Sequence, residues 1–185
     1  MPADAEPRGP SVFKIPEGDN RERLVCPDCG FIYYDNPRIV TGAVCLWEDR
    51  VLLCRRDIQP RRNYWTLPAG YLELGETTEA GAVREAWEEA RARIAIEVLL
   101  SIYNVPRISQ VQLIYRARLL SLDIGPGPES LEVRLFTWEA IPWGELAFPS
   151  VRWALDHFQQ TRHMSEFAPR SNPPGASDRL EGEGL

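Results

Sequence analysis

The sequence predicts a mixed α/β domain that follows a short N-terminal segment. Five stretches rich in Val, Ile, Leu and Tyr have the composition of β-strands, and two have the spacing of apolar residues that is typical of helices. The 185 residues are 44% hydrophobic and 26% charged, which suits one globular domain with appendages. The expected strands are 38–47, 51–55, 93–105, 110–120 and 132–138, and the expected helices are 77–90 and 150–160.

The N-terminal segment carries a knuckle typical of a zinc ribbon. Residues 1–23 are rich in Pro, Gly and charge, so we expect them to be irregular, and Cys26 and Cys29 follow with CxxC spacing. A structural zinc needs four ligands, and only two are local. Cys45 and Cys54 lie inside apolar runs and are interpreted as small buried hydrophobes. The sequence therefore favours a turn that keeps its shape without metal over a bound zinc.

The first two expected strands form a hairpin around residues 48–50, and a group of arginines follows it within a few residues of an aromatic pair. One interpretation is a wall that contacts phosphates or stacks on a base, beside the acidic helix described next. The other is a solvated loop, and the sequence leaves both open. The arginines are Arg50, Arg55, Arg56, Arg61 and Arg62, and the aromatic residues are Tyr64 and Trp65.

The helix expected over 77–90 carries a cluster of glutamates. Thr77 is suited to cap its N-terminus. Glu85, Glu88 and Glu89 fall on one face within an arc of roughly 100°. Like charges one turn apart destabilise a helix, and a cation between them would remove that cost, so the cluster is a candidate site for a hard metal. The opposite, apolar side is expected to consist of Ala80, Val83, Trp87 and Ala90.

The rest of the chain completes the domain. Residues 125–130 are a Gly- and Pro-rich loop, and 139–146 is expected to be a short helical turn. After Met164 the composition returns to Pro, Gly, Ser and charge, which is typical of disorder. We therefore expect three parts, which are an N-terminal extension over 1–36, the α/β domain over 37–163 and a disordered tail over 164–185.

Charge and hydropathy argue against two classes of partner. The net charge is −6, whereas a nucleic-acid-binding surface needs clustered positive charge. No apolar run approaches the ~20 residues that cross a bilayer. The start of the chain lacks the pattern of a secretory signal, and four cysteines then indicate reduced thiols. We expect a cytoplasmic protein that acts on a small molecule, with neither nucleic acid nor membrane as partner.

The spacing within 70–92 resembles the Nudix box. A Gly, a Glu six residues on, and then an Arg-Glu-apolar-any-Glu-Glu run occur as Gly70, Glu76 and Arg84-Glu85-Ala86-Trp87-Glu88-Glu89. Seven spaced positions match this pattern. One departs from it, because Arg91 stands where the box has a Gly that suits a left-handed helix exit. This departure puts the shape of the helix C-terminus in question and leaves the carboxylates unaffected.

The resemblance implies a fold and a metal site. The fold would be α/β/α, with a mixed β-sheet sandwiched between helices after a ribbon-like start. Glu85, Glu88 and Glu89 would bind Mg²⁺ or Mn²⁺ together with the backbone carbonyl of Ala69. Arg84 would hold these carboxylates in place, with Glu76 as its partner.

Further segments resemble one Nudix subgroup. They are CPDCG and YYDNP before the domain, CRRDIQP and WTLPAGYLELGE within it, and GPGPESLE and LFTWEAIPWGELAFPS after it. The subgroup includes hydrolases of ADP-ribose and FAD, which implies a nucleoside diphosphate derivative as substrate and a homodimer as assembly. A second CxxC, common upstream in this subgroup, is absent, and so is the signature of NADH pyrophosphatases.

The resemblance suggests roles for six further residues, each of which also has an ordinary structural explanation. A glutamate on the strand after the substrate loop would join the metals or act as base, and this is Glu132, with Glu129 as the alternative. Trp65 and Tyr103 would stack on a flavin or adenine ring, although aromatic residues on strands usually belong to the core. Arg107 would contact a phosphate, as would Arg56 of the arginine group.

Three other functions compete with hydrolysis of ADP-ribose or FAD. The chain could be a Nudix-fold sensor that binds ADP-ribose or a nucleotide without cleaving it, although a sensor has no need of the three glutamates. It could hydrolyse NADH or dinucleoside polyphosphates. It could also join a zinc-ribbon nucleic-acid module to an enzyme, against which the net acidity and the missing ligand pair argue.

Overall fold

The computed structural model describes residues 9–176 of the chain. The chain divides into two compact units, Met1–Pro37 and Arg38–Leu185, which are described separately. No helix among the described residues is long and apolar enough to span a bilayer.

The N-terminal unit contains a small antiparallel sheet of three strands, β1 (Val12–Lys14), β2 (Arg23–Val25) and β3 (Ile32–Tyr33). β1 lies in the stretch expected to be irregular, so that expectation is wrong there. The reason is that β1 pairs with β2, with Val12 opposite Val25. This pairing depends on contact between two segments, which the composition of either one does not reveal.

The CxxC knuckle keeps its shape through backbone hydrogen bonds. The N–H of Cys26 donates to the carbonyl of Phe31 at 2.8 Å, and the N–H of Gly30 donates to the carbonyl of Cys26 at 2.9 Å. Cys26 is buried and Cys29 is exposed. These backbone hydrogen bonds define the turn.

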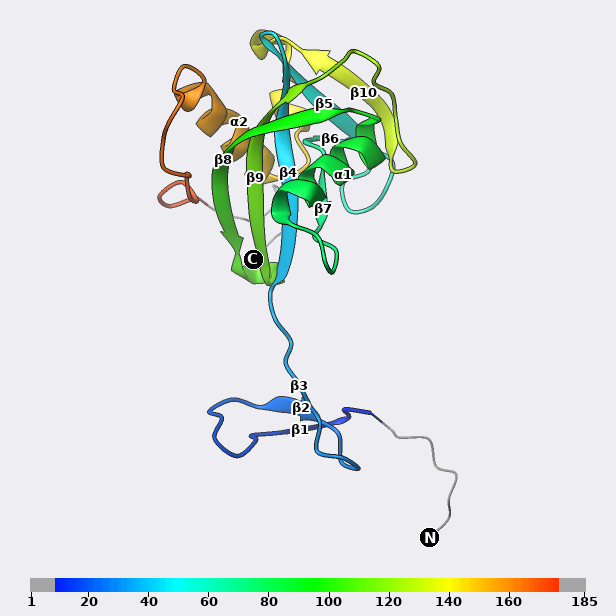
Figure 1. The fold of residues 1–185 in the computed structure, drawn as a ribbon, viewed down its shortest axis with the longest axis vertical. Coiled ribbons are helices and arrows are strands. Elements are labelled where there is room, and N and C mark those ends of the chain that lie inside the picture. Colours follow the sequence, from blue (N-terminus) through cyan, green and yellow to red (C-terminus); the bar gives the residue numbers. More distant parts are fainter. Residues whose placement is uncertain (1–8, 177–185) are drawn as a thin grey trace. The chain divides into compact units, whose positions relative to one another are not determined.

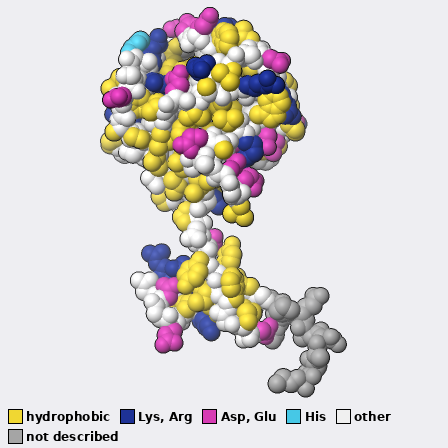
Figure 2. Space-filling view, in the orientation of Figure 1, with side chains coloured by type: hydrophobic (Ala, Val, Ile, Leu, Met, Phe, Trp, Pro, Cys, Tyr) yellow, Lys and Arg dark blue, Asp and Glu magenta, His cyan; other side chains and the backbone are white. Residues whose placement is uncertain are grey.

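Large hydrophobic side chains are exposed on the N-terminal unit, and Figure 2 shows such side chains gathered on its visible face. This small sheet has too few residues to bury its own apolar side chains. The exposed residues are Val12, Phe13, Ile15, Phe31, Tyr33 and Tyr34.

The larger unit is built on a mixed sheet with the strand order β10-β5-β4-β9-β8. β4 and β9 are parallel, whereas β4–β5, β5–β10 and β8–β9 are antiparallel. Two short strands join it, β6 beside β5 and β7 beside β4. The strands are β4 (Arg38–Trp47), β5 (Arg50–Arg56), β6 (Trp65–Thr66), β7 (Ala69–Tyr71), β8 (Ile94–Val105), β9 (Gln110–Leu119) and β10 (Ser130–Phe136).

Two helices, α1 (Thr78–Ala90) and α2 (Pro149–Thr161), lie on opposite faces of this sheet (Figure 1). Side chains alternate along β4, so Val44 joins the core cluster under α2 while Ala43 and Cys45 join the cluster under α1. The predicted α/β/α arrangement is confirmed. Three 3₁₀ turns complete the unit, η1 (Pro106–Ile108), η2 (Trp138–Ala140) and η3 (Trp143–Glu145).

Cys45 and Cys54 are buried in the sheet, as predicted. Both belong to the cluster beneath α1. Burial raises the pKa of the Cys45 thiol to about 12 and that of Cys54 well above its ordinary value. Both side chains therefore pack as neutral hydrophobes.

Helix α1 begins and ends close to the predicted positions. The Thr77 hydroxyl accepts a hydrogen bond from the N–H of Ala80 at 3.2 Å, which caps the N-terminus. Arg91 takes the left-handed conformation, with φ 51° and ψ 19°, and its N–H donates to the carbonyl of Trp87 at 2.9 Å. An arginine therefore makes the helix exit that the box usually gives to Gly.

Replacing Arg91 by Gly is expected to stabilise the protein by about 1 kcal/mol, because only Gly adopts the left-handed region without a steric cost. The gain is reduced by loss of the guanidinium, which lies 5.6 Å from the centre of the Trp87 ring. Urea unfolding of wild type and Arg91→Gly measures the difference. A destabilised variant would show that the Trp87 contact outweighs the backbone strain.

The apolar face of α1 was predicted on the wrong side. Val83 and Trp87 are 38% and 43% exposed, and Ala80 is also exposed. The buried face instead combines small residues with two of the glutamates. Small side chains let the helix approach β4 closely, which larger ones would prevent. The buried residues are Gly81, Ala82, Glu85, Ala86, Glu89 and Ala90.

The segment after Met164 is ordered as far as the structure describes it, contrary to the predicted disorder. Phe167 packs against the core cluster under α2. The N–H of Arg170 donates to Leu100 at 2.9 Å, and the carbonyl of Arg170 accepts from Ile102 at 2.8 Å. The edge of β8 offers unpaired backbone groups that this segment satisfies, which local composition cannot show. Residues 177–185, also predicted to be disordered, lie outside the described residues.

Candidate active site

A cavity of about 970 Å³ opens between α1, α2 and the sheet. Its lining comes from the start of β4, from β7, from the start of β9, from the acidic face of α1 and from the first residues of α2. The loops at 58–60 and 128–129 close its sides. Segments that are distant in the sequence thus meet around one concave space, the usual setting of a ligand site.

The glutamate cluster of α1 forms the acidic wall of this cavity. Glu85, Glu88 and Glu89 all line it, together with Arg84. Glu85 is only 8% exposed and Glu89 only 7%, whereas Glu88 is exposed. Carboxylates are rarely buried to this extent unless they are paired or bind a ligand. The sequence prediction that these glutamates act together agrees with this placement.

Arg84 connects four of the surrounding groups. Its Nε and Nη2 donate to the two carboxylate oxygens of Glu76 at 3.1 and 2.8 Å. Its Nη1 donates to Glu85 at 2.7 Å and to Glu88 at 2.9 Å, and Nη2 also donates to the carbonyl of Tyr71 at 2.9 Å. The hydrogen bonds to Glu76 contribute most to raising the pKa of the Arg84 guanidinium. The fork of donors therefore fixes three carboxylates relative to β7.

Glu89 is the most deeply placed of the three. Its pKa is raised to about 8, chiefly by burial and also by the charges of Glu85 and Glu129, while the N–H of Ala69 and the charge of Arg56 act in the opposite direction. The Ala69 N–H donates to Glu89 Oε2 at 3.2 Å, so Ala69 meets the cluster through its amide in this structure. Burial likewise raises the pKa of Glu85, against the effect of Arg84.

Two glycines allow this close packing. A Cβ at Gly70 would overlap the carboxylate of Glu85, and a Cβ at Gly127 would overlap the carbonyl oxygen of Glu88. The N–H of Gly127 donates to the carbonyl of Glu89 at 3.0 Å, so the loop at 125–129 closes the C-terminus of α1. The sequence predicted this loop but not its contact with the helix, which brings Glu129 to the cavity.

Carboxylate oxygens are suitable ligands for a hard cation, but in this structure those of Glu85 and Glu88 accept hydrogen bonds from Arg84. Oxygen donors on one helix face suit Mg²⁺ or Mn²⁺. Within residues 9–176 no three acidic, thiol or imidazole groups converge as ligands of a single ion would. Glu85 and Glu88 turn toward Arg84, and Glu89 turns toward Ala69. Rotation of these side chains would be needed to present their oxygens together.

Of the two glutamates considered for the strand after the loop, the structure brings only Glu129 to the site. Glu129 lines the cavity and acts electrostatically on Glu85 and Glu89. Glu132 lies on β10 outside the lining, with its carboxylate 3.9 Å from Arg55. Glu132 therefore lies away from the cavity in this structure, because it pairs with Arg55 of β5, which does not line the cavity, and not with Arg56, which does.

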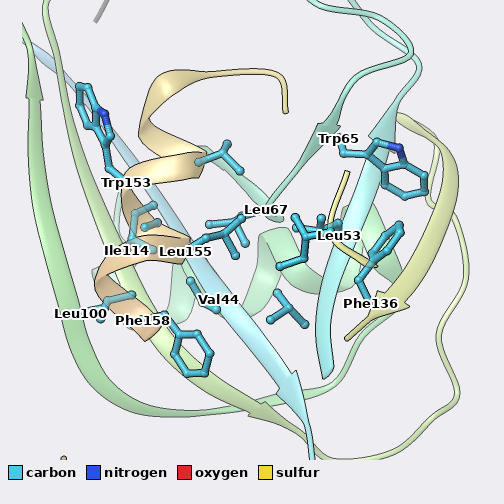
Figure 3. Packing of buried hydrophobic residues seen from close by; sticks show 14 of the residues in the cluster. Val44, Leu53, Trp65, Leu67, Leu100, Ile114, Phe136, Trp153, Leu155 and Phe158 are labelled. Carbon is cyan, nitrogen blue, oxygen red and sulfur yellow. The ribbon is translucent and has the colours of Figure 1, made fainter. Parts of the chain in front are cut away.

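The two aromatic residues expected to stack on a ring belong to the core. Trp65 is 6% exposed and packs edge-on against Phe136, with ring centres 4.9 Å apart (Figure 3). Tyr103 is fully buried, and its hydroxyl lies 2.7 Å from Nδ1 of His157. Neither lines the cavity, so these expectations are wrong. Alternation along strands β6 and β8 directs both side chains toward the core.

The arginine group divides between the cavity and the surface. Of the arginine group only Arg56 lines the cavity, and Arg107, from the turn between β8 and β9, lines it as well. Arg56 donates to the carbonyl of Pro60 at 3.0 Å and lies 5.2 Å from the centre of the Phe148 ring. Burial lowers the pKa of Arg56, against the charges of Glu89 and Glu129. The others have partners elsewhere, since Arg55 faces Glu132 and Arg62 pairs with Asp57 at 2.7 Å.

Sequence reasoning missed several residues that line the cavity. Gln110 and Gln112 project into it from one face of β9. Their spacing of two residues within an expected strand was the available signal. Other parts of the lining, such as Phe148 and Val151 at the start of α2, could not be found from local spacing because they depend on where α2 packs.

Without metal, the protein is expected to become less stable as pH rises from about 5 to about 8. Glu89 keeps its proton in the folded state up to about pH 8, whereas the unfolded chain releases it near 4.5. The folded state thus binds more protons in this window, so the free energy of unfolding falls by up to a few kcal/mol. Urea unfolding in EDTA across this range measures it. Glu89→Gln should flatten the profile, and an equal slope in that variant would contradict the assignment.

Comparisons with known proteins agree with this geometry. A family profile described as NUDIX domain matches residues 36–156, and a zinc-ribbon profile described as Nudix N-terminal matches residues 9–35. The crystal structure of a NUDIX hydrolase from Nitrosomonas europaea is 47% identical, covers 88% of this chain and 93% of its own, and superposes with a TM-score of 0.83.

Two curated relatives differ in their named activities. An ADP-ribose pyrophosphatase from Methanocaldococcus jannaschii is 25% identical over 68% of this chain and 76% of its own length. The NAD-capped RNA hydrolase NudC from Pseudomonas aeruginosa is 32% identical over 67% of this chain and 45% of its own length. The chain thus spans about half the length of several curated relatives that it matches.

Proposed function

This chain belongs to the Nudix hydrolase family, and we propose that it hydrolyses the pyrophosphate bond of a nucleoside diphosphate derivative, with ADP-ribose or FAD as the leading substrates. The observation that carries the proposal is the acidic wall itself. Glu85, Glu88 and Glu89 stand together on one side of a cavity of about 970 Å³ that is large enough for a ligand of this size.

We place a divalent cation, Mg²⁺ or Mn²⁺, at this wall. Glu85, Glu88 and Glu89 would hold it, and the carbonyl of Ala69 remains a proposed fourth ligand. Such a cation supplies charge neutralisation at the pyrophosphate and a more acidic water. Arg84 positions the carboxylates and keeps like charges apart, as its hydrogen bonds to three glutamates indicate.

Residues around this wall would contact the negatively charged phosphates of the substrate. Arg56 and Arg107 line the cavity and are proposed to contact phosphates. Glu129 lines it as well, and its charge acts on Glu89. We therefore propose that Glu129, rather than Glu132, joins the metals or acts as the base. With ADP-ribose the products would be AMP and ribose 5-phosphate, and with FAD they would be AMP and FMN.

The named activities of the relatives support the substrate class at different levels. The relative named ADP-ribose pyrophosphatase favours ADP-ribose. The relatives named NAD-capped RNA hydrolases favour an NAD-linked pyrophosphate as second candidate substrate. We propose no nucleic-acid partner, because the net charge of the chain is −6. FAD rests on the sequence resemblance to the subgroup.

A substrate panel tests the proposal. The purified protein is incubated with Mg²⁺ or Mn²⁺ and with ADP-ribose, FAD, NADH, NAD-capped RNA, diadenosine polyphosphates and dNTPs, and products are separated chromatographically. We expect AMP from ADP-ribose or FAD at the highest kcat/KM. Folded protein that cleaves none of these, yet binds ADP-ribose in a calorimeter, would replace the hydrolase by a sensor.

We further propose that the N-terminal unit folds without zinc, that the protein forms a homodimer, and that it works in the cytoplasm without a membrane partner. Only Cys26 and Cys29 provide thiols within the matched segment 9–35. Metal analysis of protein purified without chelator tests the first point, and one zinc per chain would overturn it. Light scattering on the same sample tests the dimer.

A further inference from the structure

Two glutamine side chains form a polar strip among aliphatic residues on the floor of the cavity. Gln110 and Gln112 point to the same face of β9, and both are partly buried. The aliphatic side chains of Val40, Val105 and Ile114 surround them on the same floor. An amide in such surroundings is costly unless its donors and acceptors find partners.

A chain of hydrogen bonds orients these amides. Nε2 of Gln112 donates to Oε1 of Gln110 at 3.2 Å, and Nε2 of Gln110 donates to the hydroxyl of Tyr71 at 3.0 Å. The guanidinium of Arg38 lies 5.2 Å from the centre of the Tyr71 ring and holds this residue in place. Gln112 therefore retains its carbonyl oxygen and one N–H for a ligand, and within the described residues no hydrogen bond to that oxygen is found.

The position of Gln112 suits the base of a bound nucleotide. In the sheet, Tyr71 pairs with Val40, and Val40 pairs with Gln112. Gln112 thus lies two strand spacings, or about 10 Å, from β7, whose Gly70 touches Glu85. Gln112 and the glutamates of the acidic wall line the same cavity, so a nucleotide with its phosphates at the wall has its base within the part of the cavity that Gln112 lines.

The roof above the strip is apolar. Phe148, Val151 and Trp153 of α2 and its cap line the cavity opposite the floor. Apolar walls with a few fixed polar groups are typical of sites that bind a flat ring by burial and read its edge by hydrogen bonds. The amides on the floor are the groups available for that reading.

Building on the proposed hydrolase function, we propose that Gln112 determines base specificity by pairing with the edge of adenine. Its carbonyl oxygen accepts from the exocyclic amino group of adenine while its N–H donates to the adjacent ring nitrogen, a bidentate match. Guanine could pair with the same amide through O6 and the ring N1–H, but its 2-amino group, which adenine lacks, would then need an acceptor, and the neighbouring lining residues Val40 and Ile114 offer none in their side chains. Gln110 and Tyr71 are positioning residues that fix the amide.

Binding of AMP and GMP tests this without depending on turnover, because neither has a pyrophosphate bond to cleave. Calorimetry with Mg²⁺ present compares wild type with Gln112→Leu and Gln112→Glu. Wild type should bind AMP about 10-fold more tightly than GMP. Gln112→Leu should lose this preference, and Gln112→Glu should lose or reverse it, because a carboxylate accepts from both N–H groups of guanine.

Gln160→Glu is the matched control, since Gln160 is exposed near the end of α2 and should keep the wild-type preference. Equal binding of AMP and GMP by wild type, or a preference that both Gln112 variants keep, would overturn the inference. A protein that prefers AMP through Gln112 but cleaves no pyrophosphate would contradict the proposed function alone. Hydrolysis of ADP-glucose and GDP-glucose at rates that no Gln112 variant alters would contradict the inference alone.

Discussion

Glu89→Gln is expected to lower kcat by about 10³-fold while the protein stays folded. Glu89 is the most buried carboxylate of the acidic wall and one of the three proposed ligands of the divalent cation. The amide keeps the shape and the hydrogen bond from Ala69 but removes the negative charge. Steady-state hydrolysis of the best substrate in the panel, with Mg²⁺ at saturation, measures the loss.

Glu132→Gln is the matched control for Glu89→Gln. It makes the same chemical change on β10, outside the cavity lining. There the carboxylate is 45% exposed and forms only a weak ion pair with Arg55, at 3.9 Å. Its kcat should stay within about 2-fold of wild type, because exposed ion pairs contribute little. Glu89→Gln with wild-type kcat would remove Glu89 from the active site, and a large loss in Glu132→Gln would return Glu132 to it.

Arg84→Lys is expected to lower the apparent affinity for Mg²⁺, measured through activity, by about 10- to 100-fold, although the positive charge is kept. Lysine cannot reproduce the fork that donates to Glu76, Glu85 and Glu88 together. Glu85 is then left buried with weaker pairing, so the metal-free protein should also be destabilised. Titration of activity with Mg²⁺ and urea unfolding in EDTA measure the two effects.

Arg55→Lys provides the comparison for Arg84→Lys. Arg55 faces Glu132 on the exposed side of β5 and donates to the carbonyl of Asn63, and it does not line the cavity. Its replacement should leave the Mg²⁺ dependence unchanged. If Arg84→Lys behaves like Arg55→Lys, the positioning role of Arg84 is wrong, and its charge alone suffices.

The parts of the active site that lie close together in the sequence could be predicted. Thr77 as the helix cap and the shared face of Glu85 and Glu89 depend on the geometry of one helix. The bracing of Glu76 by Arg84 agrees with the box resemblance, because the turn before α1 returns the chain to the helix. Local spacing was sufficient in each case.

The errors occurred where the orientation of a side chain depends on a second segment. Tyr103 and Trp65 are aromatic and could stack on a base, but the packing of α2 and β10 places them in the core. Glu129 lies in the loop just before β10, whereas Glu132 lies within β10, beyond the register shift between Ser130 and Glu132. Local spacing does not show which of the two reaches the cavity. The buried face of α1 was misjudged because close approach to β4 favours alanines over Trp87.

The sequence by itself determined the family, the order of the long strands and the two helices of the larger unit, and the acidic wall, because each depends on residues close together in the chain. Only the tertiary structure decided which residues surround the substrate. Gln112 meets Tyr71 through Gln110 because β9 lies parallel to β4 and β7 pairs with the other edge of β4. The reaction class is thus indicated by local spacing along one helix, whereas the proposed base specificity depends on long-range strand pairing, which spacing does not encode.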